Sequence, residues 1–143
     1  MIARSEWTNT DPNNPDGYTA HSQSGHAVRF DVSAEHLEGP TPMEAVLMAL
    51  CACTSVDVVS ILQKKRQNLE GLKVTATAEQ AKTFPRVFTH IKLTYAVKGN
   101  LSRKAVEDAV ALSQDTYCPV SNMLGKTAQI EREIVFENGG LEP

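Results

Sequence analysis

An unbroken apolar run stands out in the pattern of hydrophobic and polar positions. Residues 45–53, AVLMALCAC, include no charged side chain, and a run of this length predicts a helix buried on all faces rather than a strand. Thr41, Pro42 and Glu44 precede the run as a capping box, with proline in the first turn, where no backbone donor is needed. The basic residues 64–66 suit the C-terminus of the helix. We therefore predict one long cysteine-bearing helix, roughly 37 Å in length, as the core of the fold.

Shorter alternating segments precede this helix. Residues 2–7 alternate weakly and predict an edge strand, whereas residues 9–17 are rich in Asn, Asp, Pro and Gly and predict a turn or loop. Residues 18–23 and 26–32 then predict two short strands around Ser24–Gly25, which together form a hairpin.

Strand periodicity is clearer after the helix. In a first strand, polar residues alternate with the apolar residues Leu72, Val74, Ala76 and Ala78. Residues 84–86 then turn the chain into a long return strand. One face of this strand is expected to hold Val87, Thr89, Ile91, Leu93, Tyr95 and Val97. A last strand is marked by Ile130, Ile134 and Phe136.

Two further helices are expected between the return strand and the last strand. Ser102 is a suitable N-cap for a helix that continues to about Asp115. Pro119 suits the first position of a second, short helix, which makes Cys118 its cap residue and Gly125 its end. The order of elements predicts a single α+β domain over residues 1–143, with helices gathered on one face of a mostly antiparallel sheet.

Composition excludes several classes of function. The 143 residues are 41% hydrophobic, enough for a core, and the net charge of −3 argues against broad attraction to nucleic acid or an anionic membrane. No window approaches the roughly 18 uninterrupted apolar residues of a membrane span, because Thr54, Ser55 and Asp57 interrupt the long helix. The N-terminus, MIARSEW, includes no apolar signal region, so we expect a cytoplasmic protein.

The chemistry is expected to reside in the three cysteines, which in the cytoplasm suit redox, metal or packing roles. Residues two apart in a helix point about 200° away from each other, so Cys51 and Cys53 cannot serve one site together. Cys51 shares an apolar stripe with Leu47 and Val58 and is expected to pack. Cys53 lies where the helix changes from apolar to polar, so its thiol either meets a cavity, where it could react, or packs as well.

Cys118 has the stronger local argument for reactivity. A thiol at a helix N-terminus faces unpaired N–H groups and the positive end of the helix dipole, which lower its pKa. The other interpretation is that Cys118 fills a cap position that Ser or Asp usually occupies. No metal site and no cofactor are predicted, because the sequence has no C-x-x-C, H-x-x-x-H, G-x-S-x-G, GxGxxG or phosphate-binding loop pattern. The histidines are scattered, at positions His21, His26, His36 and His90.

Two segments together resemble the OsmC/Ohr family of thiol-dependent peroxidases. They are GPTPMEAVLMALCACTSVDVVSIL, residues 39–62, and YCPVSNML, residues 117–124. The likeness extends over residues 39–136 and is closest to the short YhfA-like branch, of which PRVFTHIKLTY, residues 85–95, is also typical. The resemblance implies an α+β fold and an intertwined homodimer in which two long cysteine-bearing helices pack at the centre. It also implies a cytoplasmic antioxidant enzyme of the stress response that reduces organic hydroperoxides or hydrogen peroxide.

The same resemblance gives the cysteines different roles. Cys53 corresponds to the attacking cysteine and Cys118 to the resolving cysteine, whereas Cys51 matches a position that need not be Cys. In the implied cycle, Cys53 becomes a sulfenic acid, Cys118 condenses with it to a disulfide, and a dithiol reductant of the lipoyl type or similar restores both thiols. The local capping argument instead makes Cys118 the more acidic thiol. We follow the resemblance, because spatial neighbours also determine how far a thiolate is stabilised.

The sequence departs from the family pattern around the attacking thiol. Family peroxidases support the thiolate with an Arg from an early loop and with a Glu directly after the Pro that opens the helix. Here Met43 follows that Pro, Glu44 comes one residue later, and the early loop has no Arg. Glu44 and Arg86 are therefore candidate supporting residues, with Arg4 and Arg29 as other sources of a cation. An Asp57 carboxylate on the Cys53 stripe would disfavour the thiolate.

A second hypothesis follows from these departures. The chain could be a non-catalytic dimer of the same fold that binds a small apolar ligand or a thiol-reactive compound. Consumption of tert-butyl or cumene hydroperoxide in the presence of a dithiol distinguishes the two functions.

Overall fold

The structure, a computed structural model, describes residues 1–8 and 15–137. It contains two compact units, Met1–Leu47 and Met48–Pro143, each of which is described by itself. The predicted loop at residues 9–17 falls mostly outside the described residues. The single domain over residues 1–143 stays a prediction.

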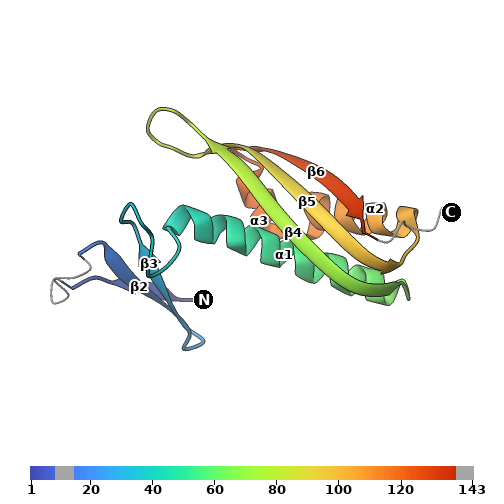
Figure 1. Cartoon of the computed structure of the whole chain (residues 1–143), viewed down its shortest axis with the longest axis horizontal. Coiled ribbons are helices and arrows are strands. Elements are labelled where there is room, and N and C mark those ends of the chain that lie inside the picture. Colours follow the sequence, from blue (N-terminus) through green and yellow to red (C-terminus); the bar gives the residue numbers. More distant parts are fainter. Residues whose placement is uncertain (9–14, 138–143) are drawn as a thin grey trace. The chain divides into compact units, whose positions relative to one another are not determined.

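The first unit is a three-stranded antiparallel sheet with the order β1–β2–β3 (Figure 1). β1 is Ala3–Glu6, β2 is Gly17–Ser22 and β3 is Ala27–Asp31. Gly25, in the turn between β2 and β3, has a φ of 86°, a conformation that Gly adopts without steric cost. The edge strand and the hairpin predicted from the sequence are therefore confirmed.

The long helix α1, Pro42–Lys64, begins at the predicted capping box. The Thr41 hydroxyl accepts from the Glu44 N–H at 3.2 Å, and the Glu44 carboxylate accepts from the Thr41 N–H at 2.7 Å. At the other end, Arg66 has a φ of 54°, which stops the helical path. One long helix with these ends was the central prediction from the apolar run, and it is confirmed.

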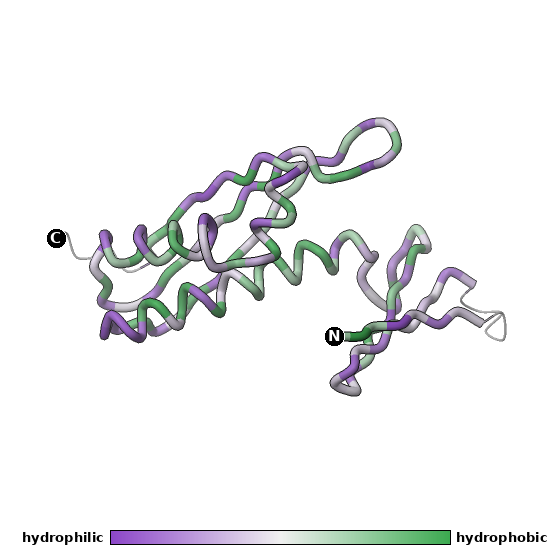
Figure 2. The backbone as a smooth tube through the Cα atoms, turned by 180° about the vertical axis from the view of Figure 1, so that it is seen from behind, coloured by the Kyte–Doolittle hydropathy of each residue, from purple (hydrophilic) through white to green (hydrophobic). Residues whose placement is uncertain are grey.

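The prediction that α1 is buried on all faces is wrong for the single chain. The helix buries one stripe, made of Leu50, Thr54, Val58 and Leu62. On the opposite side, Met48 is 59% exposed and Val56 is 69% exposed. Figure 2 shows hydrophobic residues along most of α1 up to its basic end. The sequence run is uniform because α1 has a second apolar face, which the described residues of its own unit leave exposed.

By length and composition alone, α1 is long and apolar enough to cross a membrane, and in the described part of the chain it is the one such helix. Core helices of soluble proteins pass the same test, so this finding is weak evidence for a membrane span. The interruptions at Thr54 and Asp57 do not exclude a span by composition, contrary to the expectation from the sequence.

The sheet of the second unit has the order β4–β5–β6. β4, Asn68–Gln80, pairs antiparallel with β5, Phe88–Asn100, and β5 pairs parallel with β6, Gln129–Phe136. Three of the four strand pairings in the described residues are thus antiparallel, as predicted, but they belong to two sheets rather than one.

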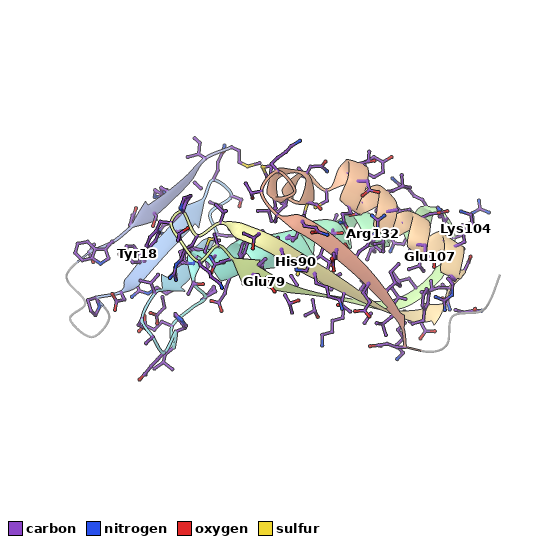
Figure 3. All side chains as sticks on the ribbon, turned by 90° about the horizontal axis from the view of Figure 1, so that it is seen from above. Tyr18, Glu79, His90, Lys104, Glu107 and Arg132 are labelled. Atoms are coloured by element: carbon purple, nitrogen blue, oxygen red, sulfur yellow. The ribbon has the colours of Figure 1, made fainter. Side chains whose placement is uncertain are left out.

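The two faces of this sheet differ in polarity. The inner face is mostly apolar, with Val74, Tyr95 and Ile134 aligned across the three strands. The outer face is charged: His90, labelled in Figure 3, lies 3.2 Å from Glu131. The prediction that Val87 and Thr89 share the inner face is wrong, because a register shift between Glu79 and Gln80 leaves Phe88 buried instead. The charged outer face explains why the helices of this unit lie on the other side.

The helices after β5 differ in one respect from those predicted. α2, Arg103–Leu112, begins at the predicted cap Ser102, but a π-helical turn, η1, Ser113–Tyr117, replaces its last turn. The short helix α3, Pro119–Leu124, then follows with Cys118 as its N-cap, as predicted.

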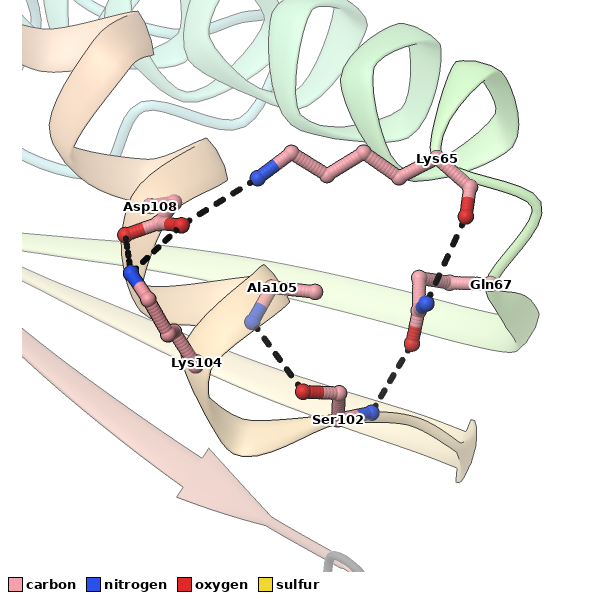
Figure 4. A network of polar contacts seen from close by, with 6 residues as sticks. All are labelled: Lys65, Gln67, Ser102, Lys104, Ala105 and Asp108. Carbon is pink, nitrogen blue, oxygen red and sulfur yellow. Dashed lines mark hydrogen bonds and ion pairs between the residues drawn. The ribbon is translucent and has the colours of Figure 1, made fainter. Parts of the chain in front are cut away.

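Polar contacts join the end of α1 to the start of α2 (Figure 4). Lys65 lies 3.3 Å from the Asp108 carboxylate, and the Gln67 side chain accepts from the Ser102 N–H at 2.8 Å. These contacts hold the C-terminal end of α1 against the N-terminal half of α2.

Truncation of one valine side chain on each face of the second sheet should show which face belongs to the core. Val97 in β5 is 1% exposed and Val135 in β6 is 42% exposed. Val97→Ala should lower the free energy of unfolding by about 2 kcal/mol, because it removes buried methyl groups and leaves a cavity. Val135→Ala is the matched control and should cost less than about 1 kcal/mol. Urea denaturation measures both values, and equal losses would contradict the assignment of faces.

Candidate active site

The structure brings Cys53 and Cys118 together from distant parts of the sequence. Cys53 is half-buried on α1, whereas Cys118, at the start of α3, is fully buried at 0% exposure. The two thiols interact, because the proximity of Cys53 is one of the causes that raise the pKa of Cys118. All three cysteines are free thiols.

Backbone contacts on both sides fix the position of Cys118. Its N–H donates to the Ser113 carbonyl at 2.8 Å, which is the bond that closes the π-helical turn η1. Its Sγ accepts from the Ser121 N–H at 3.3 Å in the first turn of α3, and its carbonyl accepts from the Asn122 side chain at 2.9 Å. The thiol is therefore held between the end of one helical segment and the start of the next.

The expectation that Cys118 is an acidic thiol is wrong. Burial, the largest cause, raises the pKa of Cys118 to about 11. The Ser121 N–H at the helix N-terminus does lower this pKa, as predicted, but the effect is smaller than that of burial. The sequence predicted that Cys118 caps α3, but it could not show that this cap lies inside the core.

Cys51 faces a different part of the molecule. It is half-buried, burial raises the pKa of its thiol, and the thiol accepts from the backbone of Ala76 in β4. At 100° per residue, Cys51 and Cys53 lie on the two flanks of the buried stripe that contains Thr54. Cys51 thus faces the sheet, as its apolar stripe predicts, and Cys53 faces α3.

A chain of buried hydroxyl groups, which the sequence reasoning missed, lies beside the two thiols. The Tyr95 hydroxyl is 2.8 Å from Thr54 Oγ1, and Thr54 Oγ1 is 2.8 Å from Ser113 Oγ. The Ser113 hydroxyl also donates to the Asp57 carboxylate at 3.1 Å. We name these four residues, Tyr95, Thr54, Ser113 and Asp57, the hydroxyl chain. A polar Thr in the middle of the apolar run was the signal that could have revealed it, since such a group needs buried partners.

Tyr95 links the hydroxyl chain to the thiols electrostatically. Burial is the main cause that raises its pKa, and the proximity of Cys118 and Cys51 raises it further. Arg132 in β6, labelled in Figure 3, lowers it, and the same guanidinium lies 3.0 Å from Asp115 in η1. Arg132 is two residues from both Ile130 and Ile134, so strand alternation would have placed it with them on the inner face.

The family model for OsmC-like proteins matches residues 34–133, a range that includes both Cys53 and Cys118. The chain belongs to the OsmC-like family. Protein YhfA of Escherichia coli strain K12 is 42% identical over 133 residues, which cover 91% of this OsmC-like chain and 93% of that protein.

Solved structures agree with this OsmC-like assignment at the level of the fold. An OsmC-like protein from Mycoplasma pneumoniae matches with a TM-score of 0.80 and 16% identity over 94% of this chain and 95% of that one. An organic hydroperoxide resistance protein OsmC from Legionella pneumophila matches with a TM-score of 0.69 and 15% identity over 94% of this chain and 97% of that one. These comparisons confirm the family resemblance inferred from the two cysteine-containing segments.

The two candidate supporting residues of this OsmC-like chain have other partners. The Glu44 carboxylate is bound in the helix cap, and its hydrogen bonds to Thr41 hold its pKa below the usual value. The Arg86 guanidinium lies 5.6 Å from the centre of the Phe84 ring, in the loop between β4 and β5. Burial, N–H groups and Cys53 are the causes that shift the pKa of Cys118, and no cation is among them.

A surface groove borders the hydroxyl chain. Its volume is about 520 Å³, and its lining comprises Asp57, Ser60, Ile61, Lys64, Lys65, Leu112 and Tyr117. Asp57 belongs to both the groove and the hydroxyl chain, so the buried hydroxyl groups lead to a solvent-accessible carboxylate. In the described residues, no group of three or more His, Cys, Asp or Glu side chains could hold a metal ion.

Titration of Cys118 should give a midpoint well above that of an ordinary thiol. The double variant Cys51→Ser with Cys53→Ser leaves one thiol, so thiolate ultraviolet absorbance then reports Cys118 alone. Removal of Cys53 should lower the pKa from about 11, but burial, the largest cause, should keep it above the ordinary value of about 8.5. The same protein in denaturant is the control and should titrate near 8.5. A folded-state midpoint below this control would mean that the helix N-terminus dominates after all.

Proposed function

We propose that the protein is a cysteine-based peroxidase that reduces organic hydroperoxides or hydrogen peroxide. The observation on which the proposal rests is the proximity of Cys53 and Cys118, two free thiols on separate helices that interact with each other. The Legionella pneumophila protein of the same fold, named for organic hydroperoxide resistance, supports peroxides as the substrate class.

The raised pKa of Cys118 supports the assignment of the attacking role to Cys53. A thiolate is the nucleophile that cleaves a peroxide O–O bond. With a pKa of about 11, roughly one Cys118 thiol in ten thousand is ionised at pH 7. Cys53 is only half-buried and is therefore less buried than Cys118. The buried thiol is therefore the poorer attacker and suits the resolving role.

The proposed cycle has three balanced steps. The Cys53 thiolate attacks one peroxide oxygen, the O–O bond breaks, and the leaving alkoxide takes a proton to give an alcohol, or water when the substrate is hydrogen peroxide. The Cys118 thiol then attacks the sulfur of the Cys53 sulfenic acid, and its proton leaves with the hydroxyl group as water. A dithiol, of the lipoyl type or similar, finally exchanges with the disulfide and becomes oxidised itself. A compartment that keeps dithiols reduced, such as the cytoplasm, suits this cycle.

We also propose that the functional form is an intertwined homodimer. The exposed apolar face of α1, with Met48, Ala52 and Val56, supports this assembly, because a long apolar stripe on a soluble monomer usually marks an interface. A second copy of the chain would bury the side of the helix that the single chain leaves exposed.

Substitution of single cysteines should separate their roles. Cys53→Ser should abolish consumption of cumene or tert-butyl hydroperoxide in the presence of a dithiol, because no sulfenic acid can form. Cys118→Ser should reduce about one peroxide per chain and then stall at the Cys53 sulfenic acid. Mass spectrometry after a stoichiometric peroxide pulse, with a sulfenic-acid trap present, measures both results.

Cys51→Ser is the matched control for this prediction. It removes a thiol from the same helix, on the flank that faces β4, and should leave peroxide consumption largely intact. A trapped adduct at Cys118 in the Cys53→Ser protein, formed as fast as in the wild type, would reverse the proposed roles. Absence of peroxide consumption by the wild type with any dithiol would favour a non-catalytic ligand-binding dimer.

Sedimentation should show a particle of twice the 15.6 kDa chain mass at micromolar concentration. Val56→Glu should convert it to monomers, because a charge on the exposed apolar face would be buried without a partner in the dimer. Val135→Glu, on the outer face of β6, is the control and should leave the dimer intact. A wild-type protein that remains monomeric under these conditions would refute the proposed assembly.

A further inference from the structure

We propose that Ser113 is a positioning residue that holds Cys118 within reach of Cys53 and thereby favours the disulfide between them. The inference rests on the proposed thiol cycle for its role in turnover, but the disulfide itself can be measured without any peroxide. Ser113 is fully buried and contacts neither peroxide nor sulfur in the proposed mechanism.

Ser113 connects the segment that contains Cys118 to the helix that contains Cys53. Its backbone carbonyl accepts from the Cys118 N–H at 2.8 Å. Its hydroxyl contacts two residues of α1, Thr54 Oγ1 at 2.8 Å and the Asp57 carboxylate at 3.1 Å. Thr54 is the residue next to Cys53 in the sequence. Ser113 therefore links the two cysteine-bearing segments through hydrogen bonds of its own, in addition to the interaction between the two thiols.

The order of donors along the hydroxyl chain follows from the number of protons available. Ser113 donates its single hydroxyl proton to the Asp57 carboxylate, so its oxygen accepts from Thr54. Thr54 then accepts from the Tyr95 hydroxyl. Thr54 and Ser113 thus each have a donor and an acceptor, and such chains strengthen their members cooperatively. This arrangement makes the Ser113 connection directional and stiff.

The π-helical turn explains why a serine at this position can make both contacts. In an α-helix, the Cys118 N–H would donate to the carbonyl four residues earlier, whereas here it donates to residue 113, five residues earlier. The additional residue in the turn lets Ser113 face α1 while its carbonyl still holds Cys118. π-Helical turns within helices occur frequently at functional sites.

The test measures the equilibrium between the Cys53–Cys118 disulfide and glutathione. Two protein thiols and one oxidised glutathione give the protein disulfide and two reduced glutathiones, so the equilibrium constant reports the effective concentration of one thiol at the other. The Cys51→Ser background leaves one pair of thiols. In this background, Ser113→Ala should lower the constant about tenfold, because the loss of its hydrogen bonds frees the Cys118 segment from α1.

Ser55→Ala is the matched control for Ser113→Ala. It removes a half-buried hydroxyl from α1, next to Thr54, whose hydrogen bond goes to the Cys51 carbonyl within the same helix. It should leave the constant within about twofold of the wild-type value. Thermal unfolding of each reduced variant shows whether a change in the constant accompanies a loss of fold.

Asp57→Asn keeps the inference testable if Ser113→Ala does not fold. Asp57 is half-buried at the groove, and the amide removes the charge that orders the hydroxyl chain. It should lower the constant about threefold. Wild-type constants in both Ser113→Ala and Asp57→Asn, or a wild-type protein that forms no Cys53–Cys118 disulfide with glutathione, would overturn the inference.

A peroxide pulse separates this inference from the proposed function. In Ser113→Ala, the Cys53 sulfenic acid should form at the wild-type rate, whereas its condensation with Cys118 should be about tenfold slower. If the wild type reduces no peroxide and the glutathione results still hold, the peroxidase proposal fails while Ser113 remains the positioning residue for the disulfide. Equal slowing of both steps in Ser113→Ala would instead indicate a general structural role and would refute a specific effect on Cys118.

Discussion

The Thr54 hydroxyl imposes the main constraint on the second unit. It lies within the otherwise apolar buried stripe of α1, at 0% exposure, and a buried hydroxyl without partners costs roughly 1–3 kcal/mol. Tyr95 from the sheet and Ser113 from η1 supply these partners. Three elements that are distant in the sequence must therefore meet at one point, and an arrangement that shifts any of them leaves a polar group unpaired in the core. Apolar packing alone would tolerate small slips of α1 along the sheet, whereas this contact does not.

Burial also decides the electrostatics of the thiols. The N-terminus of α3 favours a Cys118 thiolate, but desolvation outweighs that effect and raises the pKa to about 11. Cys53, at the edge of the same buried region, is only half-buried. The two sulfurs thus differ in their depth in the core, a property that spacing along the chain does not contain.

The sequence predicts most of the elements, because each depends on a local pattern. The capping box at Thr41, the cap at Ser102 and the Pro119 start of α3 are all local signals, and all three are confirmed. The parallel pairing of β6 and the π-helical turn were not predicted, because each depends on contacts between segments. For the same reason, the hydroxyl chain could not be inferred: Thr54, Ser113 and Tyr95 show no common spacing. The proximity of Cys53 and Cys118 came from the family resemblance, and the residues alone left it open.

The parallel pairing of β5 with β6 has a consequence for the length of the segment between them. The first residue of β6, Gln129, lies opposite His90, so the chain must return from the end of β5 at Asn100 over ten strand residues, about 33 Å. α2, η1 and α3 make this return, and Cys118 lies on the way back. The hairpin loop between β4 and β5 can gain or lose residues without moving either thiol. A single residue inserted between Ser102 and Ser113 would instead rotate the returning helix by about 100° and carry the second sulfur out of register with the first.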